Sequence, residues 1–243
     1  MDWPLLKAVS RSFYLTLRLL PAPVRESIAL AYLLARISDT RADGAETEAE
    51  KELLRREEEI RSWLAVSPDR AEIERVWTTI REGQAFDVER FTRPEPLSPV
   101  ELDRYTYLVA GCVGEFWTLL CEKRLPGFAS KPASDMVELG IRFGKALQLV
   151  NILRDRQADL DKGRVYVADS DRPAVLEQAR EHLRAAHAYI EAVRLYRLRI
   201  ACALPFLIAG ETLDLVERNP TARRVKVSRG RVRVLFVRAL FFN

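Results

Sequence analysis

The sequence predicts an all-α fold in a single domain that spans residues 1–243, and three observations support this prediction. Apolar residues recur three and four positions apart along nearly the whole chain, whereas alternating, strand-like runs are rare. Clusters of proline and glycine divide the chain at intervals typical of helices. The 243 residues, of which 48% are hydrophobic and 30% charged, suffice for one sizeable core and exclude a disordered or collagen-like chain.

Six breaks divide the chain into about eight expected helices. They lie at Pro21 and Pro23, after Asp43, at Ser67–Asp69, from Arg93 to Pro99, from Pro126 to Pro132, and from about Gly163 to Pro173. The helix after the fourth break has a capping-box start, because Ser98 is followed by Pro99 and, three residues on, by Glu101. We expect this helix to run through Trp117.

Cysteine and histidine offer little for catalysis or metal binding. The three cysteines are odd in number and have no Cys-x-x-Cys spacing, which argues against a disulfide framework or a zinc cage and fits a reducing compartment. His182 and His187 are the only histidines, too few for a multi-histidine metal site. Carboxylates must therefore hold any metal ion.

The sequence shows no sign of export or of a membrane span. Asp2 and Pro4 stand where a signal peptide has basic and then apolar residues, and no apolar run approaches the roughly 20 residues that cross a bilayer. We therefore expect a cytoplasmic protein.

Positive charge is concentrated at the C-terminus. The chain has a net charge of +4, yet eight basic residues and no acidic one lie from Arg218 onward, so the preceding part is net acidic. This basic tail, which ends in apolar residues, could contact anionic lipid at the inner face of the membrane; the alternative is a solvated terminal helix. Its residues 225–237 alternate like a strand, although Ser228 could equally cap a helix. Nucleic-acid binding is not expected, because the acidic body lacks a basic face with interleaved aromatic residues.

Two segments place aspartates four residues apart at the end of an apolar helical run. Asp39 and Asp43 form the first pair, and Asp155 and Asp159 form the second. Residues four apart lie on one helix face, so each pair presents two carboxylates toward the same point. Magnesium prefers oxygen ligands, and one or two carboxylates with phosphate oxygens often complete its shell. The two pairs therefore indicate a magnesium clamp for a diphosphate, and the alternative is two solvated helix ends.

Arginine accompanies each aspartate pair. Arg36 lies three residues before Asp39, and Arg154 immediately precedes Asp155. A guanidinium group can bind phosphate oxygens in a bidentate manner, which favours the diphosphate interpretation.

Further motifs surround the two aspartate pairs. They are Ser10–Phe13 (SRSF), Tyr32–Arg36 (YLLAR), Val109–Gly114 (VAGCVG), Gln148–Asp159 (QLVNILRDRQAD) and Gly163–Tyr166 (GRVY). In this order and spacing, from about residue 8 to 215, they resemble the squalene and phytoene synthase family. The resemblance implies an isoprenoid synthase-type helical bundle around a central cavity. It also implies an enzyme that joins two allylic prenyl diphosphates head to head through a cyclopropyl diphosphate intermediate.

The resemblance also implies roles for individual residues. Magnesium would be held by Asp39, Asp43, Asp155 and Asp159. Substrate would be bound by Arg11, Phe13, Gln148, Asn151, Arg154, Arg164 and Tyr166. Catalysis would involve Tyr32 and Arg36. Tyr105 and Tyr107 are further catalytic candidates because they lie near Leu108, the position at which a tyrosine takes part in the chemistry of eukaryotic squalene synthases.

The resemblance leaves the product open. The Asp-Thr-x-x-Asp form of the first motif favours a squalene synthase, whereas the segment Gly163–Tyr166 favours a phytoene-type enzyme. Leu108 stands where eukaryotic squalene synthases have a tyrosine that takes part in the chemistry. Our first interpretation is conversion of farnesyl diphosphate to squalene or presqualene diphosphate, with NADPH as reductant if squalene is the product. The alternatives are a phytoene or dehydrosqualene synthase and, in another class, a non-catalytic helical assembly factor.

Overall fold

The computed structural model describes residues 1–10, 13–92, 95–220, 222 and 225–242, without the side chains of Ala42 and Asp43. Every regular element in these ranges is helical, which confirms the predicted all-α class. The elements are α1 (Trp3–Ser10), α2 (Phe13–Leu19), α3 (Ala22–Asp43), α4 (Glu48–Arg55), α5 (Glu57–Ala65), α6 (Arg70–Arg90), α7 (Pro99–Thr106), the π-helical turn η1 (Tyr107–Gly111), α8 (Cys112–Arg124), α9 (Ala133–Leu160), α10 (Arg172–Ala192), α11 (Tyr196–Arg218) and α12 (Arg229–Leu240).

All six predicted breaks separate helices, but the expected number of about eight helices was too low. The additional breaks lack a cluster of proline and glycine. One lies at Arg56, between α4 and α5. Another ends α10, where the amide of Arg194 donates to the Phe128 carbonyl (2.7 Å) and the amide of Ser130 donates to the Ala192 carbonyl (2.8 Å). These long-range hydrogen bonds satisfy the backbone outside the helix, so the helix can end without a breaking residue.

Two predicted helix starts can be compared with the structure. The Ser98 hydroxyl accepts from the amide of Glu101 (3.3 Å), and the Glu101 carboxylate accepts from the amide of Ser98 (2.8 Å), which confirms the capping box. The helix that follows continues through η1 into α8. The Ser228 hydroxyl accepts from the amide of Arg231 (3.2 Å) and starts α12, so the open choice near the C-terminus is resolved in favour of a helix.

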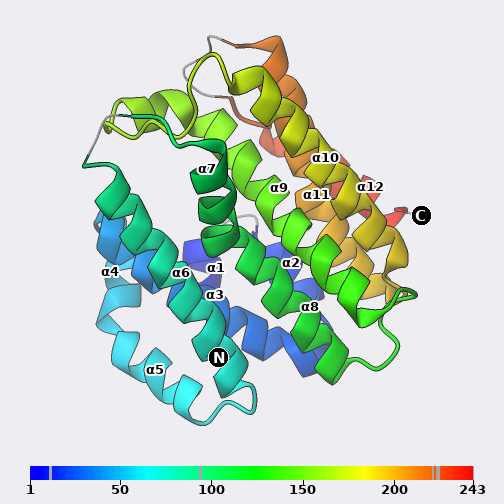
Figure 1. Cartoon of the computed structure of the whole chain (residues 1–243). Helices are drawn as coiled ribbons and strands as arrows, with labels where there is room; N and C mark the ends of the chain where they lie inside the picture. The colour runs from blue at the N-terminus through cyan, green and yellow to red at the C-terminus, as the bar shows by residue number, and fades with distance from the viewer. Residues whose placement is uncertain (11–12, 93–94, 221, 223–224, 243) are drawn as a thin grey trace.

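The long helix α9 runs through the middle of the bundle and contacts α7, η1, α8, α10 and α11 (Figure 1). Its contact with η1 and α8 depends on glycines. A Cβ atom on Gly114 of α8 would lie 1.9 Å from the carbonyl oxygen of Gly140, and one on Gly144 would lie 2.1 Å from that of Ala110. Only residues without a side chain let these backbones approach so closely.

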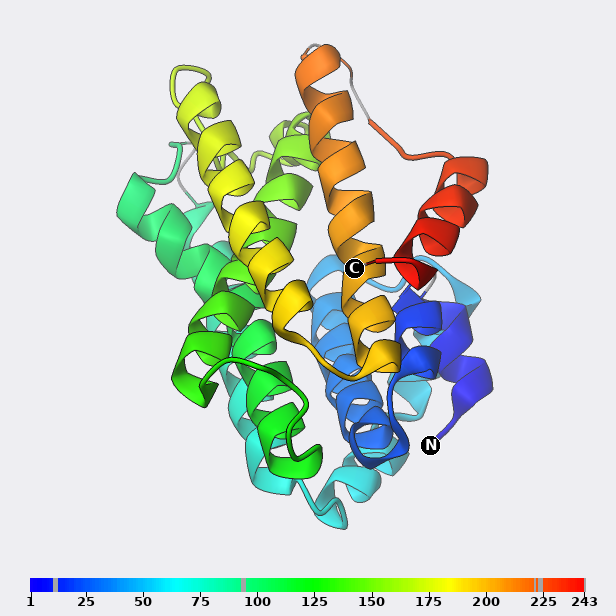
Figure 2. The same cartoon turned by 90° about the vertical axis from the view of Figure 1, so that its right-hand side faces the viewer.

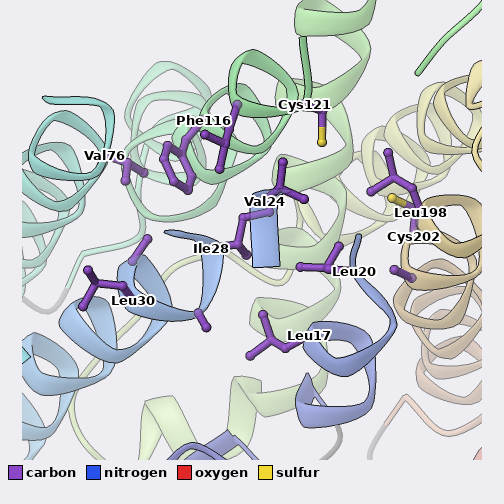
Figure 3. Packing of buried hydrophobic residues seen from close by; sticks show 14 of the residues in the cluster. Leu17, Leu20, Val24, Ile28, Leu30, Val76, Phe116, Cys121, Leu198 and Cys202 are labelled. Carbon is purple, nitrogen blue, oxygen red and sulfur yellow. The ribbon is translucent and has the colours of Figure 1, made fainter. Parts of the chain in front are cut away.

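The buried apolar side chains form two clusters. The larger one joins α2 and α3 to α6, α8 and α11, and Figure 3 shows a member from each of these helices, namely Leu17, Val24, Val76, Phe116 and Leu198. The smaller one lies among α7, α9, α10 and α11, and partly buried Phe206 packs against both. Figure 2 shows α12 alongside α11, at the outside of the bundle. No described helix is both long and apolar enough to cross a bilayer.

Candidate active site

The first aspartate pair lies at the C-terminal end of α3. Gln84 of α6 donates a hydrogen bond of 2.6 Å from its side-chain amide to the Asp39 carboxylate. The backbone of Asp43 ends the helix, whereas its side chain lies outside the described part of the structure. The first motif is therefore tied to α6 through Asp39.

The second pair lies in the last turns of α9. Arg154 donates from Nε to the neighbouring Asp155 (2.9 Å) and contacts the second carboxylate oxygen through a terminal nitrogen. Burial raises the pKa of Asp159 to about 6, and the negative charges of Asp155 and Asp87 act in the same direction against Arg164. Asp159 is thus held close to other carboxylates in a partly dehydrated place.

Helix α6 connects the two pairs. Gln84 and Asp87 are three residues apart and therefore lie on one face of this helix. Gln84 binds Asp39 of the first pair, and Asp87 lies near enough to Asp159 of the second pair for its charge to act on it. The two motifs, more than a hundred residues apart in the sequence, therefore converge on the face of α6 that carries Gln84 and Asp87.

The donor set in this region fits a hard cation. Among the described side chains, no group of three or more His, Cys, Asp or Glu residues is arranged as a metal site, and Asp43 is not part of that set. However, the described groups are oxygen donors, and the repulsion that Asp155 and Asp87 exert on Asp159 is of the kind that a divalent cation relieves. Of the four aspartates that the sequence predicts as magnesium ligands, Asp39, Asp155 and Asp159 have described side chains.

The segment after α9 folds back over the second pair. Gly163 has a φ angle of +75°, a left-handed conformation that glycine adopts without strain, and the amide of Arg164 then donates to the carbonyl of Asp159 (2.8 Å). The guanidinium of Arg164 lies 3.7 Å from the Asp87 carboxylate. The hydroxyl of Tyr166 donates to the other oxygen of Asp87 (2.7 Å). Two predicted substrate-binding residues therefore meet at one carboxylate of α6.

Tyr105 joins this group. Its ring stacks on Tyr166 with 5.2 Å between the centroids, and the two hydroxyls lie 3.3 Å apart. Burial, and then the charge of Asp87, raises the pKa of Tyr105; burial also raises that of Tyr166. Both phenols therefore remain protonated at neutral pH and can act as hydrogen-bond donors.

Asp87 and Gln84 were not among the residues predicted from the sequence. Asp87 is 9% exposed and follows buried Ile80 and Gly83 on the apolar face of α6. An acid in such a position needs a partner, because a buried charge without one is costly. The helical spacing of Asp87 within an apolar face was therefore a usable signal.

Tyr107 turns away from Tyr105. Its hydroxyl donates to the Glu115 carboxylate (2.7 Å), and that hydrogen bond, with burial, raises the pKa of Tyr107 to about 12. The structure thus brings Tyr105 to the Asp87 group and places Tyr107 against α8.

The remaining predicted residues on α2 and α3 occupy separate environments. Tyr32 packs against Phe13, with 5.2 Å between the ring centroids, and its hydroxyl lies 3.3 Å from the Val9 carbonyl oxygen. Arg36 forms an ion pair with Glu50 of α4, while its Nε is buried without a hydrogen-bond partner among the described residues. Arg11, a predicted substrate-binding residue, lies outside the described residues.

An apolar cavity of about 260 Å³ opens among α2, η1, α8, α9, α10 and α11. Phe13 and Leu147 line it, as do the glycines of the α8–α9 crossing. Along α9, Leu147, Asn151 and Asp155 follow one another at four-residue intervals, so one helix face leads from the cavity to the second aspartate pair. Gln148 lies one residue further along the same turn as Leu147.

These features can be compared with known proteins. A family model described as squalene/phytoene synthase matches residues 6–171 and 172–231. The chain belongs to this family. Its members are prenyltransferase-type enzymes of isoprenoid biosynthesis that join their substrates head to head.

Two curated members of the squalene/phytoene synthase family show how far the likeness extends. Presqualene diphosphate synthase of Rhodopseudomonas palustris is 32% identical over 174 residues, which cover 66% of this chain and 59% of that protein. Phytoene synthase of Thermus thermophilus is 29% identical over 188 residues, which cover 68% of this chain and 59% of that protein. The match thus spans 59% of the length of each relative.

The squalene/phytoene synthase fold is also recognised in three dimensions. The structure of TcSQS in complex with a ligand has a TM-score of 0.84 to this chain at 22% identity, and the match covers 98% of this chain and 85% of that one. At this level of identity the likeness shows the fold.

Proposed function

We propose that this member of the squalene/phytoene synthase family is a magnesium-dependent enzyme that condenses two molecules of farnesyl diphosphate to presqualene diphosphate or squalene. One observation carries the proposal: a single face of α9 joins the apolar cavity at Leu147 to the carboxylates of Asp155 and Asp159. A prenyl diphosphate has the same two parts, an apolar chain and a charged head that needs a cation.

Different residues would bind the two ends of the substrate, the diphosphate and the apolar chain. When bound, magnesium would neutralise the diphosphate as it leaves the allylic carbon. Asp39, Asp155 and Asp159 would hold the ion, and Arg154 and Arg164 would bind diphosphate oxygens through their guanidinium groups. Their present carboxylate partners, Asp155 and Asp87, keep both arginines beside the metal-binding carboxylates.

The apolar end would protect the allylic cation that remains after the diphosphate has left. The cavity is lined almost wholly by apolar and aromatic side chains, which exclude water from the cation. Aromatic faces attract a cation, and Phe13 and Trp117 both border the cavity. Tyr32, packed on Phe13, would hold that ring in place, and Tyr105 would hold Tyr166 beside Asp87 at the charged end.

The product is the finer part of the proposal. Squalene requires a reduction, for which NADPH would be the reductant, whereas presqualene diphosphate requires none. The alternative product class is phytoene or dehydrosqualene, and both a presqualene diphosphate synthase and a phytoene synthase are among the similar proteins.

The test is incubation of the full chain with farnesyl diphosphate or geranylgeranyl diphosphate, with magnesium or a chelator and with or without NADPH, followed by product identification. We expect presqualene diphosphate from farnesyl diphosphate and magnesium, and squalene if NADPH also enters the reaction. Phytoene from the longer substrate would replace the proposed product by the alternative. Absence of any condensed product from either substrate would overturn the proposal.

We also propose that α12 makes a reversible contact with an anionic membrane surface, at the inner face of the cytoplasmic membrane. The helix packs on the bundle through buried Leu235 and Ala239, while Val234 and Val237 are about half exposed and Phe241 is mostly exposed. The helix also carries several arginines, which anionic lipid headgroups attract.

We further propose that residues 1–243 act as one functional domain. Leu147 and Phe206 support this, because each packs against both buried clusters. Limited proteolysis that released a stably folded fragment would contradict it.

A further inference from the structure

A second, polar cavity lies on another side of α9. It has a volume of about 360 Å³ and is bounded by the C-terminal part of α9, the start of α10 and the end of α11. Among its described lining residues are three arginines, Arg154, Arg156 and Arg172, but only one acid, Asp169. The volume is in the range of sites that hold small molecules, about 300–1,000 Å³.

Arg172 is the arginine of this cavity with the weakest compensation of its charge. A terminal nitrogen of Arg172 donates to the carbonyl of Val216 (3.2 Å), which lies in the last turn of α11. Its Nε is buried and has no hydrogen-bond partner among the described residues. A buried donor of a charged group without an acceptor is unfavourable, so an anion that enters the cavity would gain a partner here.

Arg156 offers a second donor of the same kind. One terminal nitrogen contacts Asp169, whose side chain is 83% exposed and therefore well hydrated. The Nε of Arg156 is also buried without a hydrogen-bond partner among the described residues. Two guanidinium groups that face one cavity, each with a buried unused donor, match the several acceptor oxygens of a phosphate group.

A neighbouring arginine links the cavity to the candidate active site. Arg154 belongs both to this cavity and to the second aspartate pair, because it also holds Asp155. The cavity therefore lies next to the place where the proposed reaction releases diphosphate.

We infer that the polar cavity is a binding site for a phosphate or diphosphate anion, held by Arg156 and Arg172 without a metal ion. Arg156 lies within the second aspartate motif but is not among the residues predicted to bind the substrate or the metal, and Arg172 lies outside the motifs. The chemical class of the anion follows from the guanidinium groups alone. That the anion in the cell is the diphosphate released by the reaction rests on the proposed function.

The test is isothermal titration of the full chain with inorganic diphosphate in the presence of a chelator. We expect the wild type to bind diphosphate. The cavity variant, Arg156→Gln/Arg172→Gln, should bind at least about tenfold more weakly, as loss of charge-assisted hydrogen bonds predicts. The matched control is Arg70→Gln/Arg184→Gln, which removes the same charge from two exposed ion pairs and should bind like the wild type. Failure of the wild type to bind, or equal binding by the cavity variant, would overturn the inference.

Two further measurements keep the result interpretable. Circular dichroism reports whether the double variant folds. If the double variant does not fold, the single variants Arg156→Lys and Arg172→Lys take its place, because each retains the positive charge but loses the guanidinium group. Unchanged diphosphate binding by both single variants would also overturn the inference. Titration with farnesyl diphosphate under chelator identifies the source of the anion. If only inorganic diphosphate binds and depends on the two arginines, the site takes the free anion; if both do, it also takes the substrate head. If the wild-type protein shows no turnover of prenyl diphosphates but binds diphosphate through Arg156 and Arg172, the proposed function is rejected and the anion site stands.

Discussion

The hydroxyl of Tyr166 donates a hydrogen bond of 2.7 Å to the carboxylate of Asp87, although the two residues are 79 positions apart. This contact fixes the segment after α9 on α6. Because α6 also binds Asp39 through Gln84, the contact places the segment beside both aspartate pairs. The geometry of the candidate site therefore depends on a buried acid that belongs to neither motif.

Tyr166→Phe should destabilise the protein and disorder this segment. The change leaves the buried Asp87 with one donor fewer, and loss of a hydrogen bond to a charged group costs about 1.5–3 kcal/mol. We expect the free energy of unfolding in urea to fall by that amount. In a double-mutant cycle with Asp87→Asn, the two effects should not add. Additive effects would show that the hydrogen bond contributes nothing.

Gly114→Ala should separate α8 from α9. The new Cβ atom would meet the backbone oxygen of Gly140 at 1.9 Å, and neither helix can yield locally, so overpacking should cost about 1–3 kcal/mol or more. The matched control is Gly210→Ala in α11, where nothing lies within 4 Å and the helix should gain up to about 1 kcal/mol. Melting temperatures test both, and equal values for the two variants would contradict the close-packing argument.

Asp69 should make stability depend on acid pH. It is 1% exposed, and burial alone would raise its pKa, but hydrogen bonds from Arg124 (2.7 and 2.9 Å), Ser27 (2.7 Å) and Lys123 outweigh this, and the pKa lies below its ordinary value of 3.8. A carboxyl group with a lowered pKa stabilises the fold above the unfolded-state pKa, and that contribution is lost as the pH falls through the folded-state value.

Asp69→Asn tests this account. Breaking a buried ion pair costs about 3–5 kcal/mol, so the variant should be strongly destabilised at pH 7. When the pH is lowered from 5 to below 3.8, the free energy of unfolding should fall less in the variant than in the wild type, because the variant has no Asp69 carboxylate to protonate. Glu74→Gln, which breaks an exposed pair with Arg70, is the control and should cost at most about 1 kcal/mol. Urea unfolding at both pH values gives the comparison, and parallel pH profiles for wild type and Asp69→Asn would refute the assignment.

The contact of α12 with membranes should depend on its exposed side chains. We expect co-sedimentation with anionic liposomes at low salt, a smaller bound fraction at high salt because of screening, and none with neutral liposomes. Val237→Ser/Phe241→Ser should lose binding without a change in melting temperature, because both residues are more than half exposed. Leu235→Ser, at a buried position, should lower the melting temperature instead. Undiminished liposome binding by the double variant would reject the proposed contact.

Local signals in the sequence were sufficient for much of the fold. Apolar periodicity predicted the helical class, and Ser98 with Glu101 predicted a helix start that the structure confirms. The end of α10 was not predictable in this way, since it depends on hydrogen bonds to Phe128 and Ser130, which are distant in the sequence. A helix end that is set by tertiary contacts, like that of α10, is not marked by proline or glycine in the sequence.

In the candidate site, too, local spacing predicts some neighbours, whereas others depend on tertiary packing. Spacing alone brings Asp155 and Asp159 to one helix face, whereas the neighbour that joins them to the first pair, Asp87, becomes apparent only once α6 is packed. Tyr105 and Tyr107 were treated together, but residues two apart on a helix do not share a face. The structure accordingly directs Tyr105 to Tyr166 and Tyr107 to Glu115.

The most direct test of the central claim is turnover of farnesyl diphosphate by Asp155→Asn in the presence of magnesium. Its matched control is Asp135→Asn, which removes the same charge from an exposed position at the other end of α9. Both variants should keep the helical circular dichroism of the wild type. Our account predicts that Asp135→Asn condenses the substrate at the wild-type rate, while Asp155→Asn loses most of its turnover. Near wild-type turnover by folded Asp155→Asn would contradict the claim that the aspartate pairs hold the metal and the diphosphate.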